Sequence, residues 1–192
     1  PVTGDDARHW GPPFWHKSAA YFQALNRDKH GITVDFKNPK EVGRLRRLII
    51  ETDSVVLQNF RPGLVAELGI SAADIRRENN KVIYCNIGAF GDAGPYKERR
   101  GYDPLMQASA GLMSVTGEGG DRPPVRVGTS IIDMGTGMWT ALGIMAAVRQ
   151  RDETGEGCTI DASLYETAIA WMTYHAAAYD ASGDIPKAAG SG

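Results

Sequence analysis

The sequence predicts an α/β domain in which helices flank a parallel β-sheet. Two short, almost continuously apolar runs, at 54–57 and 82–87, have the pattern of parallel strands that are covered on both faces. Segments with helical periodicity lie between and after these runs, so that strand and helix alternate along the chain. The alternation indicates βαβ units, whose strands end together at one edge of the sheet.

The first half of the chain predicts three strands beyond an irregular aromatic opening, the two apolar runs above and one before them, with helices between them. We expect a strand at 31–36, where side chains alternate in the β manner up to Asn38-Pro39. Residues 40 to about 52 predict a helix, because apolar side chains recur on one face and arginines fall on the others. Ser71 is a typical N-cap residue and Asp74 follows it at the third helical position, so another helix is expected to begin there.

The second half predicts a helix at 104–113 and an exposed turn at 117–124. A small apolar run at 127–132 is followed by Asp133 and then by a long hydrophobic helix at 134–150, so we expect a strand-to-helix junction at Asp133. Residues 159–161 predict a short strand, and Ser163 caps a last helix that extends to about residue 181.

Composition excludes several classes of function. The 192 residues carry 21 Lys plus Arg and 23 Asp plus Glu, a formal net charge of −2, so the chain lacks the positive field expected of a nucleic-acid binder. Apolar runs such as 144–148 are interrupted before the ~20 residues that span a bilayer, and we expect no membrane segment. The expected partner is therefore a small molecule.

The two cysteines and four histidines give no metal or disulfide pattern. Cys85 and Cys158 stand alone in apolar stretches, which favours small buried side chains in a reducing, cytoplasmic compartment, with a mitochondrial location open for a eukaryotic source. The histidines lack metal-ligand spacing, so no metal is expected, and no serine stands in a nucleophile elbow. Gly135-Thr136-Gly137 resembles a dinucleotide-binding glycine motif but lacks its third glycine.

Asp133 is the candidate catalytic residue. An isolated carboxylate where an apolar segment turns into a helix is expected at the carboxyl edge of the sheet, where α/β proteins bind ligands. The positive end of the helix would keep that carboxylate ionised, as a nucleophile must be, and Gly135 and Gly137 would leave a substrate room to approach. The alternative is that Asp133 is only the N-cap of the helix.

A second candidate follows the first apolar run directly. In Asn59-Phe60-Arg61-Pro62-Gly63, an aromatic ring and a guanidinium suit the base and the phosphate of a nucleotide-like ligand. A plain Pro-Gly turn explains the same residues.

Order and spacing of several motifs along essentially the whole chain resemble the class III coenzyme A (CoA) transferases, the CaiB/BaiF family. The motifs are Leu25-Asn26-Arg27-Asp28-Lys29, Asn59-Phe60-Arg61-Pro62-Gly63 with Leu68-Gly69, Gly101-Tyr102-Asp103, Gly111-Leu112-Met113 with Thr116-Gly117, Asp133 with Thr136-Gly137, and Thr154-Gly155-Glu156-Gly157. The resemblance is nearest to the succinyl-CoA:glutarate and related dicarboxylate transferases.

The resemblance implies a partial Rossmann-like sheet and a cytoplasmic CoA-transferase without a metal. Asp133 stands where the family keeps an aspartate that forms an acyl anhydride and then an aspartyl-CoA thioester. The positions that match the CoA site are Val34, Asp35, Phe36, Lys37, Asn59, Phe60, Arg61, Arg100, Gly101, Tyr102 and Asp103. Phe60 would cover the adenine, while Arg61 and Arg100 would reach phosphates.

Two alternatives stay open beside the transferase. Racemases of the family carry a histidine where this chain has Tyr102, and a tyrosine with an ordinary pKa near ~10 is a poor base at neutral pH, which favours transfer. The chain also begins at Pro1 without Met and ends at Gly192, so we expect a large-domain fragment, incomplete at both ends, of a protein that forms an interlocked homodimer. A non-catalytic CoA-binding fragment is the second alternative.

Overall fold

The computed structural model describes residues 3–190. Pro1, Val2, Ser191 and Gly192, where we expect unfinished ends, lie outside the described residues. The chain divides into two compact units, Pro1–Leu48 and Ile49–Gly192, and each is described by itself.

The first unit is built from short elements and one longer helix. A 3-10 helix η1 (Asp6–His9) precedes an antiparallel pair of two-residue strands, β1 (Phe14–Trp15) and β2 (Ser18–Ala19). Helix α1 (Ala20–Leu25) follows, and α2 (Pro39–Glu51) begins in this unit and confirms the helix expected from residue 40.

The strand expected at 31–36 is wrong. These residues form no ladder, and Ile32, whose alternation suggested a buried face, is 68% exposed. The backbone N–H of Asp35 donates instead to the carboxylate of Glu41 at 2.6 Å. Alternation predicts a strand only where a neighbouring strand accepts its backbone groups, and none does here among the described residues.

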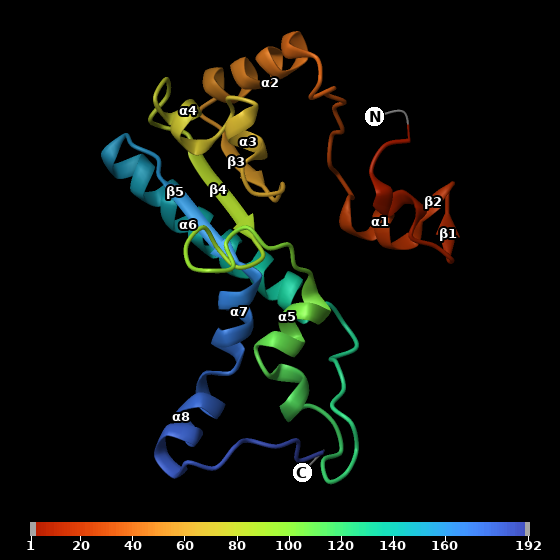
Figure 1. The fold of residues 1–192 in the computed structure, drawn as a ribbon. Coiled ribbons are helices and arrows are strands. Elements are labelled where there is room, and N and C mark those ends of the chain that lie inside the picture. The colour runs from red at the N-terminus through yellow and green to blue at the C-terminus, as the bar shows by residue number, and fades with distance from the viewer. Residues whose placement is uncertain (1–2, 191–192) are drawn as a thin grey trace. The chain divides into compact units, whose positions relative to one another are not determined.

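The second unit contains a three-stranded parallel sheet (Figure 1). Strands β3 (Val55–Gln58), β4 (Ile83–Gly88) and β5 (Thr159–Ser163) stand in the order β3-β4-β5, which confirms the strands expected near 54–57, 82–87 and 159–161. The central strand is the most buried, as its continuous apolar run predicts. Cys85 lies on it as a free thiol, and burial first, then Cys158 and Asp161, raises its pKa to about 11.

Among the described residues, seven helical segments accompany the sheet. Helices α3 (Leu64–Glu67) and α4 (Ala72–Arg76) lie between β3 and β4, and Ser71 with Asp74 forms the expected capping box at the start of α4. After β4 come α5 (Asp103–Ser109), the 3-10 helix η2 (Leu112–Val115) and α6 (Ile131–Thr154). In place of the single last helix that we expected, the structure has two, α7 (Leu164–Trp171) and α8 (Thr173–Ser182), which are separated at Met172.

Helix α6 joins the sheet to the other helices. Its Ala147 belongs to a core cluster with Ile83 and Cys85 of β4, while Ile132 packs with Met106 of α5 and Ala168 of α7. Figure 1 shows α5 and α7 side by side beyond the end of the sheet that β4 points to. The first turn of α6 is therefore fixed among α5 and α7.

Two expectations about the segment around α6 need correction. Residues 127–130 form no strand, and α6 already begins at Ile131, so Asp133 lies inside the first turn of the helix rather than at the end of a strand. By length and composition α6 is also long and apolar enough to cross a membrane, contrary to our expectation for the sequence. Within this stretch 28% is buried, and α6 packs against β4, β5, α5 and α7.

Candidate active site

A cavity of about 610 Å³ lies at the carboxyl ends of the three parallel strands. Gln58 at the end of β3, Asn86 within β4 and Asp161 within β5 line it, and the loops after β3 and β4 close its sides. This is the edge at which α/β sheets bind ligands. The cavity lies wholly within the second unit.

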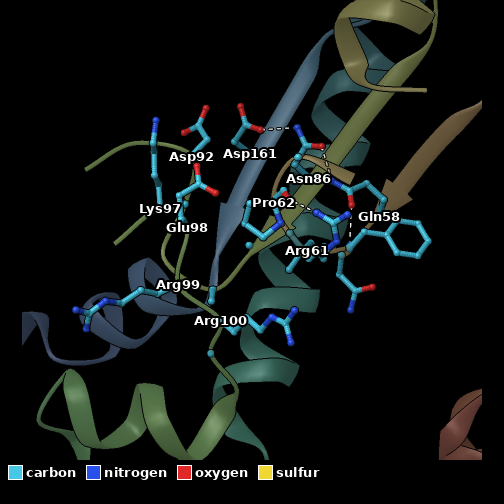
Figure 2. A pocket seen from close by; sticks show the side chains of 18 of the residues that line it. Gln58, Arg61, Pro62, Asn86, Asp92, Lys97, Glu98, Arg99, Arg100 and Asp161 are labelled. Atoms are coloured by element: carbon cyan, nitrogen blue, oxygen red, sulfur yellow. Dashed lines mark hydrogen bonds between the residues drawn. The ribbon is translucent and has the colours of Figure 1, made fainter. Parts of the chain in front are cut away.

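A row of hydrogen bonds crosses the sheet at the base of this cavity (Figure 2). The three polar residues stand directly opposite one another in the parallel register. The side-chain NH₂ of Gln58 donates to the side-chain oxygen of Asn86 at 2.8 Å, and the side-chain NH₂ of Asn86 donates to the Asp161 carboxylate at 2.7 Å. The side-chain oxygen of Gln58 accepts the backbone N–H of Phe60 at 2.8 Å. The row thus ties the loop after β3 to the sheet.

The cavity brings together five of the residues predicted for the CoA site: Asn59, Phe60, Arg61, Arg100 and Gly101. Tyr102 and Asp103 follow Gly101 directly but do not line the cavity; the Tyr102 side chain is 66% exposed, and Asp103 is buried. Val34, Asp35, Phe36 and Lys37 belong to the first unit.

Two further cations that our sequence analysis did not single out line the cavity. Lys97 and Arg99 lie on the loop after β4, in the run that ends at Arg100. Figure 2 shows Arg99 and Arg100 extending in opposite directions, and the Arg99 guanidinium lies 4.4 Å from the centre of the Tyr96 ring. The basic run itself, interrupted only by Glu98, was the signal available in the sequence.

Arg61 forms an ion pair that bears on its expected role. Its guanidinium donates to both carboxylate oxygens of Glu67 on α3, at 3.1 and 2.7 Å. The hydrogen bond and the charge of Glu67 raise the pKa of Arg61, and the same hydrogen bond lowers the pKa of Glu67. A ligand phosphate at Arg61 must share or replace this carboxylate.

Asp133 is the third residue of α6, and it is exposed. The helix begins at its N-cap Ser130, so Asp133 is not the N-cap. Burial around the carboxyl group and the nearby charge of Asp103 raise the pKa of Asp133. The N–H groups that were expected to keep Asp133 ionised are engaged elsewhere: those of Ile132 and Asp133 donate to Asp103, at 2.7 and 3.1 Å.

The two glycines beside Asp133 have different surroundings. A Cβ on Gly135 would lie 2.8 Å from the ring of Trp171 and 3.1 Å from the methyl group of Thr167, so this glycine serves the close packing of α6 on α7. Gly137 faces open space. The room that we expected for a substrate is therefore present at Gly137 and absent at Gly135.

Comparison with known proteins decides the family. The family model described as CoA-transferase family III matches residues 1–192. This chain belongs to CoA-transferase family III. It is 41% identical over 180 residues to the succinyl-CoA:glutarate CoA-transferase of Mus musculus, a match that covers 93% of this chain and 41% of that protein.

Further relatives agree with this family. The succinate–glutarate CoA-transferase of Agrobacterium fabrum is 38% identical over 192 residues, covering 97% of this chain and 48% of the relative. The crystal structure of a CaiB/BaiF family protein from Brucella suis superposes with a TM-score of 0.91 at 40% identity, over 97% of this chain and 50% of that one. This CoA-transferase family III chain thus spans about half the length of the relatives it matches.

The described part of the chain combines a basic cavity with an accessible carboxylate. Residues 3–190 contain no group of three or more His, Cys, Asp or Glu side chains placed to hold a metal ion. They do contain a cavity with cations at the sheet edge and an accessible carboxylate, Asp133, whose pKa is raised. A carboxylate with a raised pKa is a better nucleophile once ionised, because basicity and nucleophilicity rise together.

Proposed function

We propose that the full-length protein containing this chain is a CoA-transferase that moves CoA from an acyl-CoA donor to a carboxylic acid through covalent intermediates on Asp133. Asp133 carries the proposal: it is a carboxylate with a raised pKa, open to solvent in the first turn of α6, in a chain of CoA-transferase family III. Succinyl-CoA and dicarboxylic acids are the proposed substrates, since the mouse and Agrobacterium relatives are named for succinate and glutarate.

The first half of the reaction loads CoA onto Asp133. A carboxylate oxygen of Asp133 attacks the thioester carbonyl carbon, the C–S bond breaks, and CoA leaves as a thiolate from a mixed anhydride. The thiolate then attacks the aspartyl carbonyl carbon. The anhydride C–O bond breaks, the donor leaves as a carboxylate, and an aspartyl-CoA thioester remains.

The second half runs the same steps with the acceptor. Its carboxylate attacks the aspartyl carbonyl and expels CoA thiolate, which gives a second anhydride. The thiolate attacks the acceptor carbonyl, so that the acceptor leaves as an acyl-CoA and Asp133 is a carboxylate again. Each intermediate retains the activation of the thioester, so transfer consumes no ATP.

The cavity at the sheet edge is proposed to hold the CoA nucleotide. Phe60 offers an aromatic face for the adenine, and Arg61 and Arg100 offer donors for phosphates. Lys97 and Arg99 add positive charge at the same loop. Val34 to Lys37, Tyr102 and Asp103 stay predictions that the cavity does not include.

A trapping experiment on the full-length protein tests the function. With succinyl-CoA and glutarate, the wild type should form a new acyl-CoA, and borohydride should reduce the aspartyl thioester so that the peptide containing residue 133 acquires a homoserine. Asp133→Ala should abolish transfer and trapping, and Asp133→Asn nearly so, because neither side chain forms the anhydride. Near-normal turnover of the alanine variant would rule out this mechanism.

We also propose that the full-length protein is a homodimer. Helix α6 exposes Met138, Leu142 and Met145, each more than half exposed, on a face that does not pack on the sheet. Light scattering of the full-length protein tests this, and a monomer at micromolar concentration would refute it.

A further inference from the structure

The carboxylate of Asp103 is engaged by the backbone beside the proposed nucleophile. Asp103 is the first residue of α5 and is only 2% exposed. One of its oxygens accepts the backbone N–H groups of both Ile132 and Asp133, at 2.7 and 3.1 Å. The side chain of Ser130, the N-cap residue of α6, makes no capping hydrogen bond. Asp103 on α5 therefore caps the N-terminus of α6 in its place.

Gln107 extends this contact toward the start of the same segment. It lies one turn after Asp103 on α5 and is fully buried. Its amide N–H donates to the other Asp103 oxygen at 2.5 Å, and its carbonyl oxygen accepts the backbone N–H of Val127 at 2.8 Å. Two neighbouring side chains of α5 thus bind both ends of the segment 127–133.

We propose that Asp103 is a positioning residue for this reaction: together with Gln107 it holds the segment 127–133 and thereby fixes Asp133 relative to the cavity. The inference rests on the proposed function of Asp133. Asp103 lies two residues after Gly101, which lines the cavity. The start of α5 therefore connects the cavity wall to the proposed nucleophile. Because its carboxylate is buried and already accepts three N–H groups, Asp103 acts through Asp133 in this proposal rather than as the CoA contact that the family resemblance implies.

The hydrogen-bond count explains why a carboxylate stands at this position. Three N–H donors, from Gln107, Ile132 and Asp133, converge on Asp103, and a carboxylate has an acceptor oxygen on each side. Asparagine has one acceptor and one donor group. If the asparagine oxygen faces the α6 backbone, its NH₂ group lies against the side-chain NH₂ of Gln107, and two donors face each other. Rotating the Gln107 amide by 180° removes that clash but leaves the Val127 N–H without its acceptor. Asp103→Asn therefore leaves at least one buried donor unpaired.

The charge of Asp103 gives a second, separable effect on Asp133. Burial, and then the Asp103 charge, raises the pKa of Asp133, so an uncharged residue at 103 lowers that pKa. The other ionisable side chains on the elements that pack against α6 are Tyr84 and Cys85 on β4, Asp161 on β5, and Tyr165 and Glu166 on α7. Of the two acids among them, Asp161 is bonded to Asn86 and Glu166 to Ser163.

The test compares Asp103→Asn with Thr140→Val in the full-length protein. Thr140 is a matched control, because its hydroxyl is also buried and donates to the Thr136 carbonyl further along α6. We expect Asp103→Asn to lower kcat by about 10²-fold, the scale of a displaced reacting group, with an unchanged KM for succinyl-CoA. The acidic limb of the kcat profile should move to lower pH, and hydrogen exchange across 127–134 should accelerate. Thr140→Val should leave the rate, the limb and the exchange unchanged.

A second variant keeps the proposal testable if Asp103→Asn does not fold. Gln107→Met removes the bonds to Val127 but retains the Asp103 charge, so we expect faster exchange and a lower kcat with no shift of the acidic limb. Wild-type exchange across 127–134 in the variants that fold would overturn the proposal. So would a raised KM for succinyl-CoA at unchanged kcat, which would make Asp103 a CoA contact. If the wild type itself transfers no CoA, the proposed function fails, while the exchange measurement still decides whether Asp103 holds the segment.

Discussion

At the scale of single residues, the environment of Asp133 favours reactivity over stability. A helix N-terminus ordinarily stabilises a carboxylate, and we expected this one to be kept ionised. In the structure burial, and then the charge of Asp103, raises the pKa of Asp133, and Asp103 also accepts the N–H groups of Ile132 and Asp133. Asp133 is therefore held in a place where its own charge is costly.

This cost predicts a pH-dependent gain in stability for Asp133→Asn. Because the folded pKa of Asp133 is raised above the unfolded value, the folded state binds its proton more tightly. The wild type thus loses stability as pH rises from the unfolded pKa, near ~4, through the raised folded value. The asparagine variant lacks this loss, so its advantage should grow over that range and then remain constant.

Thermal melting of the full-length protein at a series of pH values measures the effect. Asp121→Asn, which removes one exposed charge from the 117–124 turn, is the control for net charge. A wild type that is more stable than Asp133→Asn at neutral pH would contradict the raised pKa of Asp133.

The ion pair of Arg61 predicts opposite effects for its two partners. Arg61→Ala should weaken CoA binding by about 1.5–3 kcal/mol if the guanidinium donates a charged hydrogen bond to phosphate. Glu67→Gln should strengthen binding, because the competing carboxylate is removed while an exposed ion pair of this kind contributes little to stability.

Calorimetric titration of the full-length protein with CoA compares these variants. Arg149→Ala is the matched control, since Arg149 forms a similar exposed pair with Glu153 on α6 and does not line the cavity. Equal CoA affinity of Arg61→Ala and the control would assign Arg61 to the surface rather than to the nucleotide.

At the scale of elements, the turn before β5 depends on a close backbone approach. A Cβ on Gly157 would lie 2.4 Å from the carbonyl oxygen of Lys81 and 2.5 Å from that of Val82. The Arg76 guanidinium donates to the Gly157 carbonyl at 2.7 Å and to that of Val82 at 3.2 Å, which fixes this approach. Close packing thus explains the second glycine of the Thr154-Gly155-Glu156-Gly157 motif.

Gly157→Ala is therefore expected to destabilise the second unit by about 1–3 kcal/mol or more, the range for forced overpacking, because backbone atoms cannot move aside as a side chain can. Gly43→Ala is the contrasting variant: Gly43 lies inside α2 facing open space, and alanine there should add about 0.5–1 kcal/mol. Urea denaturation followed by circular dichroism measures both. An alanine at 157 that costs no stability would refute the close approach.

Sequence reasoning succeeded where local chemistry and burial agree. The continuous apolar runs of β3 and β4 and the capping box at Ser71 predicted elements that the structure confirms. It failed at 31–36 and 127–132, where patterns of apolar residues had no strand to pair with. Pairing is a long-range property, so no local pattern decides it.

The candidate site was predictable in part for the same reason. Asn59, Phe60 and Arg61 follow a strand directly, so their place at the sheet edge could be derived from the sequence. The contact of Asp103 with the backbone of Asp133 joins residues thirty positions apart and could not. The ion pair between Arg61 and Glu67 depends on how tightly the chain turns into α3, which the sequence does not specify.

At the scale of the whole molecule, the described residues hold one part of the proposed site. Asp133 and the cavity proposed for CoA lie in the second unit, while Val34 to Lys37 lie in the first. The chain spans about half the length of its relatives. The reaction of the complete protein must therefore be measured on the full-length form.

The choice between transfer and racemisation gives the last prediction. A racemase must move a proton off and onto the carbon beside the thioester, and so needs a base near neutral pH in addition to the aspartate. Tyr102 holds the corresponding position here with a 66% exposed side chain, and none of the four histidines lines the cavity. We therefore expect the full-length protein to exchange acyl groups between succinyl-CoA and a free acid without exchanging the α-hydrogen of a 2-methylacyl-CoA in deuterated water. Mass spectrometry follows both reactions in one incubation, with Asp133→Ala as the control for each. Deuterium entering the α-position without acyl exchange would reverse the assignment, because it would require a base other than Tyr102.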